Sequence, residues 1–146
     1  MLKSFKSLII LLILTILLSA CDWGRTPSNI RFAKNCNVEF PSDVQVIKDE
    51  YEGMGNDWAV YYTIKLTRPE MISFISKVKR LNIYYSAGLA SNENESSNEL
   101  LIKQYREGAW YRKNHSYEFY KDNGGITLNA DVDTVNLTAE FQEFGR

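Results

Sequence analysis

The chain has 146 residues, of which 45% are apolar and 24% are charged, and its formal charge is −1. This length favours one folded domain, and the apolar content excludes an intrinsically disordered chain. The balance of 17 basic against 18 acidic residues excludes a polybasic nucleic-acid binder, and two cysteines are too few for a disulfide-rich miniature fold. The composition therefore predicts a single globular unit without a nucleic-acid partner.

The N-terminal segment has the pattern of a signal peptide. Lys3 and Lys6 precede an uninterrupted run, residues 8–18, that is apolar apart from Thr15. A membrane-spanning helix needs about 20 apolar residues, so this run is too short to cross a bilayer and has the length of a signal-peptide core. We expect residues 1–20 to be cleaved from the mature protein.

The run ends in Leu18-Ser19-Ala20-Cys21. This segment resembles the lipobox of bacterial lipoproteins, which implies cleavage between Ala20 and Cys21, a thioether-linked diacylglycerol on Cys21, and an acyl chain such as palmitate on the new amino terminus. Two or more acyl chains anchor a protein stably. The alternative is an ordinary secretory signal in which Cys21 is incidental.

Asp22 directly follows the predicted lipidation site. An aspartate at this place resembles the signal that retains enterobacterial lipoproteins in the inner membrane. It favours the periplasmic face of the inner membrane as the location in the cell envelope, with the outer membrane as the alternative.

The mature chain divides into two parts. Residues 21–35 mix Gly, Pro, Ser and charged side chains without periodicity, which predicts a flexible tether, and residues 36–146 are expected to form one globular domain. With Cys21 acylated, Cys36 has no intramolecular partner. We interpret it as a small buried hydrophobe, with an intermolecular disulfide or a reactive thiol as alternatives.

The first half of the domain predicts a hairpin and a helix. Alternating or β-branched segments at 44–53 and 58–66 flank a glycine-containing turn at 52–57, which indicates two antiparallel strands. Thr67 and Glu70 then have the spacing of a capping box, and an apolar face at i, i+3, i+4 and i+7 starts at Met71. Together these features predict a helix over about 68–81.

The second half predicts further strands around polar loops. Residues 82–86 suggest a short strand, 86–98 a loop, and 99–106 either a helix or a strand. Residues 116–121, 126–132 and 135–141 read as strands, joined by turns at 122–125 and 133–134. The predicted fold class is α+β: a small antiparallel sheet with one main helix on one face, in the order β-β-α-loop-β-β-β.

The polar motifs fall short of a catalytic or metal site. Asn129, Asp131, Asp133 and Glu140 have the 1-3-5-12 spacing of a calcium-binding loop, but Thr134 stands where that loop needs glycine. His115 is the only histidine, and there is no Cys-x-x-Cys or Gly-x-Ser-x-Gly. We therefore predict no metal, no cofactor and no catalytic residue, and interpret His115 as a surface residue.

Aromatic residues make up 13% of the chain. Neighbours in a strand point to opposite faces of a sheet, so one member of each aromatic doublet is expected to face away from the core. Such side chains are common in protein interfaces, although core packing is an equal alternative. The candidate interaction residues are Tyr61, Tyr62, Tyr84, Tyr85, Trp110 and Tyr111.

These observations predict a membrane-anchored envelope lipoprotein that binds a protein partner and is not an enzyme. It would act as an adaptor in an envelope complex or as an immunity-type inhibitor. The alternatives are a hydrolase of cell-wall or other glycans that uses acidic residues near Glu52 and Asp57, and a carrier of a small ligand.

Overall fold

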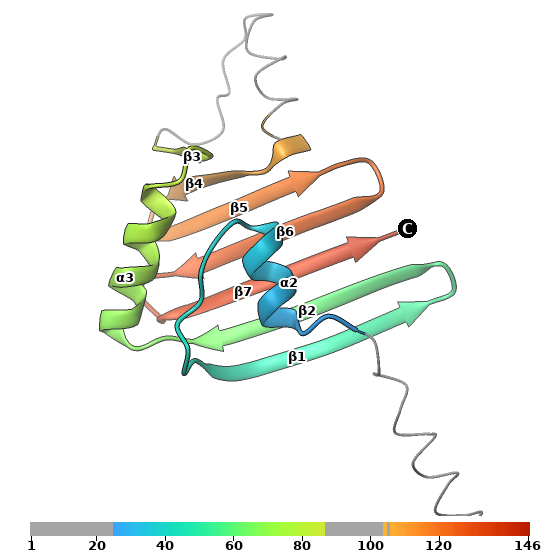
Figure 1. Cartoon of the computed structure of the whole chain (residues 1–146), viewed down its shortest axis with the longest axis horizontal. Coiled ribbons are helices and arrows are strands. Elements are labelled where there is room, and N and C mark those ends of the chain that lie inside the picture. The colour runs from blue at the N-terminus through green and yellow to red at the C-terminus, as the bar shows by residue number, and fades with distance from the viewer. Residues whose placement is uncertain (1–24, 87–103, 105) are drawn as a thin grey trace, which may run out of the picture.

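The computed structural model describes residues 25–86, 104 and 106–146. They contain the helices α2 (Ser28–Asn35) and α3 (Arg68–Lys79), helical residues at 104 and 106–107, and seven strands: β1 (Gln45–Met54), β2 (Asp57–Lys65), β3 (Tyr84–Tyr85), β4 (Ala109–Lys113), β5 (Ser116–Asp122), β6 (Ile126–Asp133) and β7 (Thr138–Gly145). All seven strands belong to one sheet, in the order β1-β2-β7-β6-β5-β4-β3 (Figure 1).

The sheet is larger than predicted and is mixed. Every neighbouring pair is antiparallel except β3 and β4, which run parallel. The predicted fold class, a small antiparallel sheet with one main helix, is therefore wrong in the size of the sheet, in its strand directions and in its number of helices. A two-residue strand such as β3 has too short a pattern to reveal its direction.

β7 is an interior strand, third in the order of the sheet. It pairs with β2 on one side and with β6 on the other. It thus joins the β1–β2 hairpin to the β4–β5–β6 meander, although many residues separate these two units in sequence (Figure 1). The hairpin, β5 and β6 follow the sequence prediction, whereas β4 has no counterpart among the predicted strands and this long-range order does not appear in any local pattern.

α3 confirms the predicted helix. The Glu70 carboxylate accepts hydrogen bonds from the Thr67 amide and hydroxyl, each at 2.7 Å, which secures the start of the helix. Met71, Phe74 and Val78 are buried along one face, as the apolar spacing predicts.

α2 lies where the sequence predicts a tether. Phe32 is 0% exposed and stacks on Tyr62 of β2 with a centroid separation of 6.0 Å. The Ser28 hydroxyl donates a 2.6 Å hydrogen bond to Asp49 of β1. An eight-residue helix is unstable alone and depends on such tertiary contacts, and the local sequence of this amphipathic segment does not reveal those partners.

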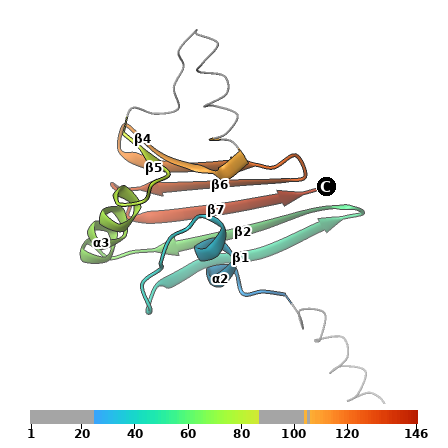
Figure 2. The ribbon, with the colours of Figure 1, turned by 45° about the horizontal axis from the view of Figure 1, so that its top comes forward.

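Both helices cover the same face of the sheet (Figures 1 and 2). That face carries the core, whose largest fully buried side chains are Trp110, Phe32, Phe74, Phe119, Phe141, Ile64 and Leu66. Cys36 is also buried and is a free thiol, as the simpler interpretation predicts. Burial, and secondarily the nearby Glu143 carboxylate, raises the pKa of this thiol well above its usual range.

The turn between β6 and β7 is longer than predicted. The Asp133 carboxylate accepts hydrogen bonds from the amides of Val135 and Asn136, at 2.7 and 2.9 Å. This Asx-type turn extends to Leu137, so β7 begins at Thr138 rather than at Val135. The side chain of Val135 is consequently exposed.

The predicted signal peptide, the lipobox and most of the 86–106 region lie outside the described residues. Gln104, Arg106 and Glu107 are helical, which agrees with one of the two interpretations of 99–106. Neither α2 nor α3 has the length and apolar character to cross a bilayer.

Candidate functional site: the open face of the sheet

The face of the sheet opposite the helices is the candidate site, and we call it the open face. No helix of the described residues covers it (Figure 2). Strand register and alternation place polar and aromatic side chains there from six strands. Its charged and aromatic members are Lys48, Glu50, Glu52, Asp57, Tyr61, Lys65, Tyr111, Lys113, Glu118, Tyr120, Asp122, Asp131, Asp133, Glu140 and Phe144.

Three carboxylates stand side by side across the middle of the open face. Asp131 of β6 is paired with Glu118 of β5 on one side and with Glu140 of β7 on the other. We call these three residues the carboxylate row. Like charges at directly opposite positions of neighbouring strands are destabilising, so the row opposes the stability of the sheet.

The electrostatics of Asp131 show the effect of the row. Desolvation, followed by the negative charges of Glu118, Asp133 and Glu140, raises the pKa of Asp131. Lys113 only partly offsets this, because its ammonium is bonded to Glu118 at 3.1 Å. Tyr111 donates a 2.8 Å hydrogen bond to the other Glu118 oxygen. The open face therefore carries a concentrated negative charge.

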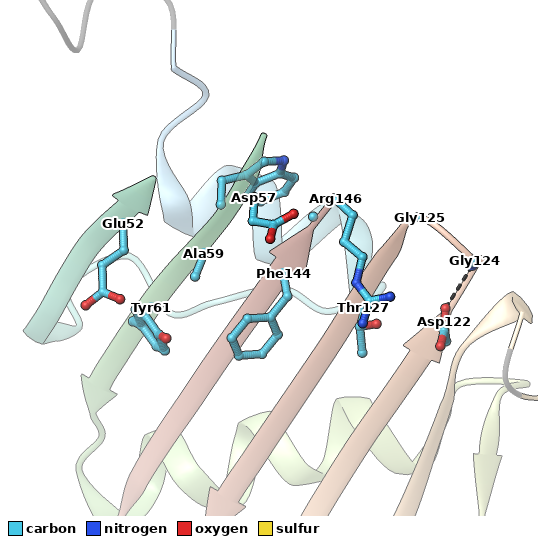
Figure 3. A pocket seen from close by; sticks show the side chains of 12 residues that line it. Glu52, Asp57, Ala59, Tyr61, Asp122, Gly124, Gly125, Thr127, Phe144 and Arg146 are labelled. Carbon is cyan, nitrogen blue, oxygen red and sulfur yellow. Dashed lines mark hydrogen bonds between the residues drawn. The ribbon is translucent and has the colours of Figure 1, made fainter. Parts of the chain in front are cut away.

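A groove of about 570 Å³ lies at one end of the open face, and we call it the aromatic groove (Figure 3). Tyr61 and Phe144 form its floor, with their rings edge to face and the centroids 6.0 Å apart. Glu52, Asp57 and Asp122 line it from the strand ends, together with Arg146. This arrangement offers flat apolar surface beside carboxylates.

The open face already binds one cation of its own. The Lys48 ammonium lies 4.6 Å from the centroid of the Tyr61 ring and 3.0 Å from the Glu50 carboxylate. Both contacts favour a positive charge, through the ring quadrupole and through direct attraction. This cluster is an internal example of how a lysine or arginine from another molecule would bind beside it.

The predicted interaction residues divide between the two faces. Tyr61 and Tyr111 are half-buried on the open face. Their neighbours Tyr62 and Trp110 are 3% and 0% exposed and belong to the core, so these two cannot meet a partner. The Trp110 indole nitrogen donates a 2.9 Å hydrogen bond to the Cys36 carbonyl, which satisfies its polar group inside.

The remaining aromatic doublet lies at the edge of the sheet that β3 forms, at the far end from β1. Tyr84 and Tyr85 form β3 and are half-buried, and the Tyr84 ring packs against Tyr117 with centroids 6.2 Å apart. The predicted residues are therefore not one surface. The sequence analysis names Asp131 and Glu140 but not the carboxylate row, whose only local signal is the polar half of each strand's alternation. It misses Phe144, which lies beyond the end of the predicted strand 135–141.

The calcium-loop spacing is a coincidence of strand pairing. Asp131 and Glu140 are cross-strand neighbours in β6 and β7, and Asn129 faces Gln142. Within the described residues, no three histidine, cysteine, aspartate or glutamate side chains are placed to hold a metal ion. His115 is exposed in the turn between β4 and β5, as predicted.

Comparison with known proteins finds no family model, curated protein or solved structure that matches this chain, so its function is inferred from the open face itself.

Proposed function

We propose that the protein is a lipid-anchored module of the bacterial envelope that binds a basic protein partner on its open face. The observation that carries the proposal is the carboxylate row of Glu118, Asp131 and Glu140. A cross-strand array of like charges costs stability, and such departures from a locally favourable sequence concentrate at functional sites. A cationic partner would relieve the repulsion on binding.

The surroundings of the row suit a protein partner. Tyr61, Tyr111, Tyr120 and Phe144 add half-buried aromatic area on the same face. Aromatic side chains are enriched at the energetically important centres of interfaces, and opposite charge accelerates encounter. The Lys48 cluster on Tyr61 and Glu50 supports lysine and arginine as the partner's contact residues.

The proposed location rests on the lipobox at Cys21 and on Asp22. Acyl chains on Cys21 would hold the domain at the membrane, in the inner-membrane leaflet that faces the periplasm or in the outer membrane. Binding without catalysis is the role of an adaptor or of an immunity-type inhibitor.

The test places a photocrosslinking amino acid at Gln142, in the middle of the open face, in the full chain in its own envelope. The matched control places it at Ser73, which is exposed on α3. We expect a protein adduct from Gln142 alone, with the crosslinked peptide rich in lysine or arginine. The Asp131→Asn/Glu140→Gln variant should lose that adduct, because the charge that attracts the partner is gone.

Other outcomes contradict the proposal. An adduct on a neutral or acidic peptide, an adduct that survives the double substitution, or a glycan adduct in place of a protein would each exclude a basic protein partner. Radioactive palmitate supplied to the cells should label the parent chain and not the Cys21→Ala variant, and a parent chain without label would exclude the anchor.

A glycan hydrolase is the second candidate, because Glu52 and Asp57 both line the aromatic groove. Paired carboxylates beside an aromatic platform are the groups that glycoside cleavage uses. Release of sugar from peptidoglycan or oligosaccharides, lost in Asp57→Asn, would favour this function over binding alone.

A further inference from the structure

A second groove lies on the side of the sheet that carries the helices. It has a volume of about 550 Å³ and lies between α3 and the turn joining β4 to β5. We call it the basic groove. Its charged and titratable lining residues are Arg68, Lys79, Arg112 and His115, and no carboxylate lines it.

No carboxylate of the described residues neutralises the cations of the basic groove. Among the described residues, Arg68, Lys79 and Arg112 form no ion pair with a carboxylate. The Lys79 ammonium lies over the ring of Tyr117, 5.5 Å from its centroid. Three positive charges around one groove attract an anion, and guanidinium groups suit phosphate in particular.

The same groove is also partly apolar. Met71, Ile75 and Leu137 line it, and Ile72 at its rim is 65% exposed. A free inorganic anion would gain nothing from these side chains. An anion attached to an apolar body would use both parts of the groove, which is the chemistry of a phospholipid.

The helices α2 and α3 also carry basic and exposed apolar side chains on the side of the sheet that they cover. α2 and α3 contain five basic residues and one acidic residue. Arg31 pairs with Glu143 and Lys77 with Glu39, which leaves Lys34, Arg68 and Lys79 without an ion pair among the described residues, and the exposed Ile30 of α2 repeats the arrangement of Ile72. A surface of exposed isoleucines between lysines and arginines is typical of proteins that lie on anionic membranes.

The position of α2 in the chain places this face near the proposed anchor. Ser28 begins α2, only seven residues after Cys21. A chain segment of this length spans at most about 25 Å even when extended. The folded domain therefore starts close to the bilayer, whereas a tether to residue 35 would have doubled that reach.

We infer that the face covered by α2 and α3 lies on an anionic lipid leaflet, and that the basic groove binds a phospholipid phosphate there. The open face then points away from the membrane, towards the partner. The orientation rests on the proposed anchor at Cys21, whereas the lipid chemistry of the groove does not.

The experiment uses the processed protein purified from the envelope, with a fluorophore on Ser76→Cys in the basic groove; Cys36 is buried and escapes labelling. Vesicles contain brominated phosphatidylcholine, with or without phosphatidylglycerol. We expect quenching of the fluorophore only with phosphatidylglycerol. Arg68→Gln/Lys79→Gln should weaken the contact about fivefold for each charge removed.

Lys48→Gln/Lys113→Gln is the matched control, because it removes the same charge from the open face. It should leave the quenching unchanged. Equal quenching with and without phosphatidylglycerol, or an equal loss in the control variant, would overturn the inference. Complete suppression of the quenching by inorganic phosphate alone would also overturn the inference, in favour of a free phosphate ligand.

Flotation separates this result from the proposed anchor. A lipidated protein floats with both kinds of vesicle, and the quenching then reports the orientation. A protein that floats only with phosphatidylglycerol lacks the anchor but supports the lipid site, provided the quenching persists when Cys21, then a free thiol, is replaced by alanine. One that floats with neither contradicts both.

Discussion

Glu143 is a carboxylate that the fold places on the helix-covered side of β7. It is 4% exposed, and its Oε2 lies 3.7 Å from Nε of Arg31 on α2. Burial raises the pKa of Glu143 against the opposing influences of Arg31 and Asn35. The carboxyl is therefore protonated more readily in the folded state than in the unfolded chain.

This difference gives Glu143 a defined pH dependence. Because its folded-state pKa is raised, its contribution makes the free energy of unfolding fall as the pH rises above the ordinary value of 4.5. We expect Glu143→Gln to raise the free energy of unfolding at neutral pH, on the order of 1 kcal/mol, and to flatten its decline with pH. Urea unfolding across that range checks this, and a variant less stable than the parent at neutral pH would contradict it.

Asp131 gives the matching prediction on the open face. Its pKa is also raised above the ordinary value of 3.8, so its contribution to stability falls as the pH rises. Asp131→Asn should raise the melting temperature at neutral pH and have no effect below the ordinary pKa. Asp57→Asn is the control outside the carboxylate row. If Asp131→Asn lowers the melting temperature, the row is not a source of repulsion.

At the scale of the element, α2 depends on one side chain. Phe32 contacts Tyr62 and, with centroids 5.5 Å apart, Phe141. Phe32→Ala should lower the free energy of unfolding by about 3–5 kcal/mol, because it leaves a cavity in the core. Ile30→Ala, on the exposed side of the same helix, should change it by less than about 0.5 kcal/mol. Equal effects in urea unfolding would mean that α2 does not pack as a helix.

The elements show which signals the sequence contains. α3 has a capping box and an apolar face of its own, and β1, β2, β5 and β6 have alternation or β-branched runs, so all of them are predictable from local pattern. α2 and β3 are defined by contacts with distant residues: Phe32 against β2, and Tyr84 beside Trp110 of β4. Local sequence does not encode such partners.

The candidate site likewise has features that local sequence predicts and features that it does not. Alternation correctly predicts that Tyr61 and Tyr62 face opposite sides, but it cannot say which side α2 and α3 cover. The carboxylate row needs the register of three strands, since Glu118 and Asp131 become neighbours only through the β5–β6 pairing. The row was therefore invisible before the strand order was known.

At the scale of the whole molecule, the two faces differ in charge. The open face carries the carboxylate row, and the helix-covered face carries the basic groove. If the partner is basic, its association rate should fall steeply with added salt while its dissociation rate changes little. Stopped-flow measurement over a range of salt concentrations tests this, and an association rate independent of salt would contradict electrostatic attraction to the open face.

The position of β7 between the hairpin and the meander would affect the export of the proposed lipoprotein. The β1–β2 hairpin and the β4–β6 meander both expose an unpaired strand edge until residues 138–145 enter between them. During synthesis these residues emerge after both of the units that they join, so the sheet cannot close before they do. A chain destined to pass a membrane in unfolded form would benefit from this delay. Moving this strand ahead of β1 by circular permutation should produce earlier folding in the cytoplasm and slower secretion.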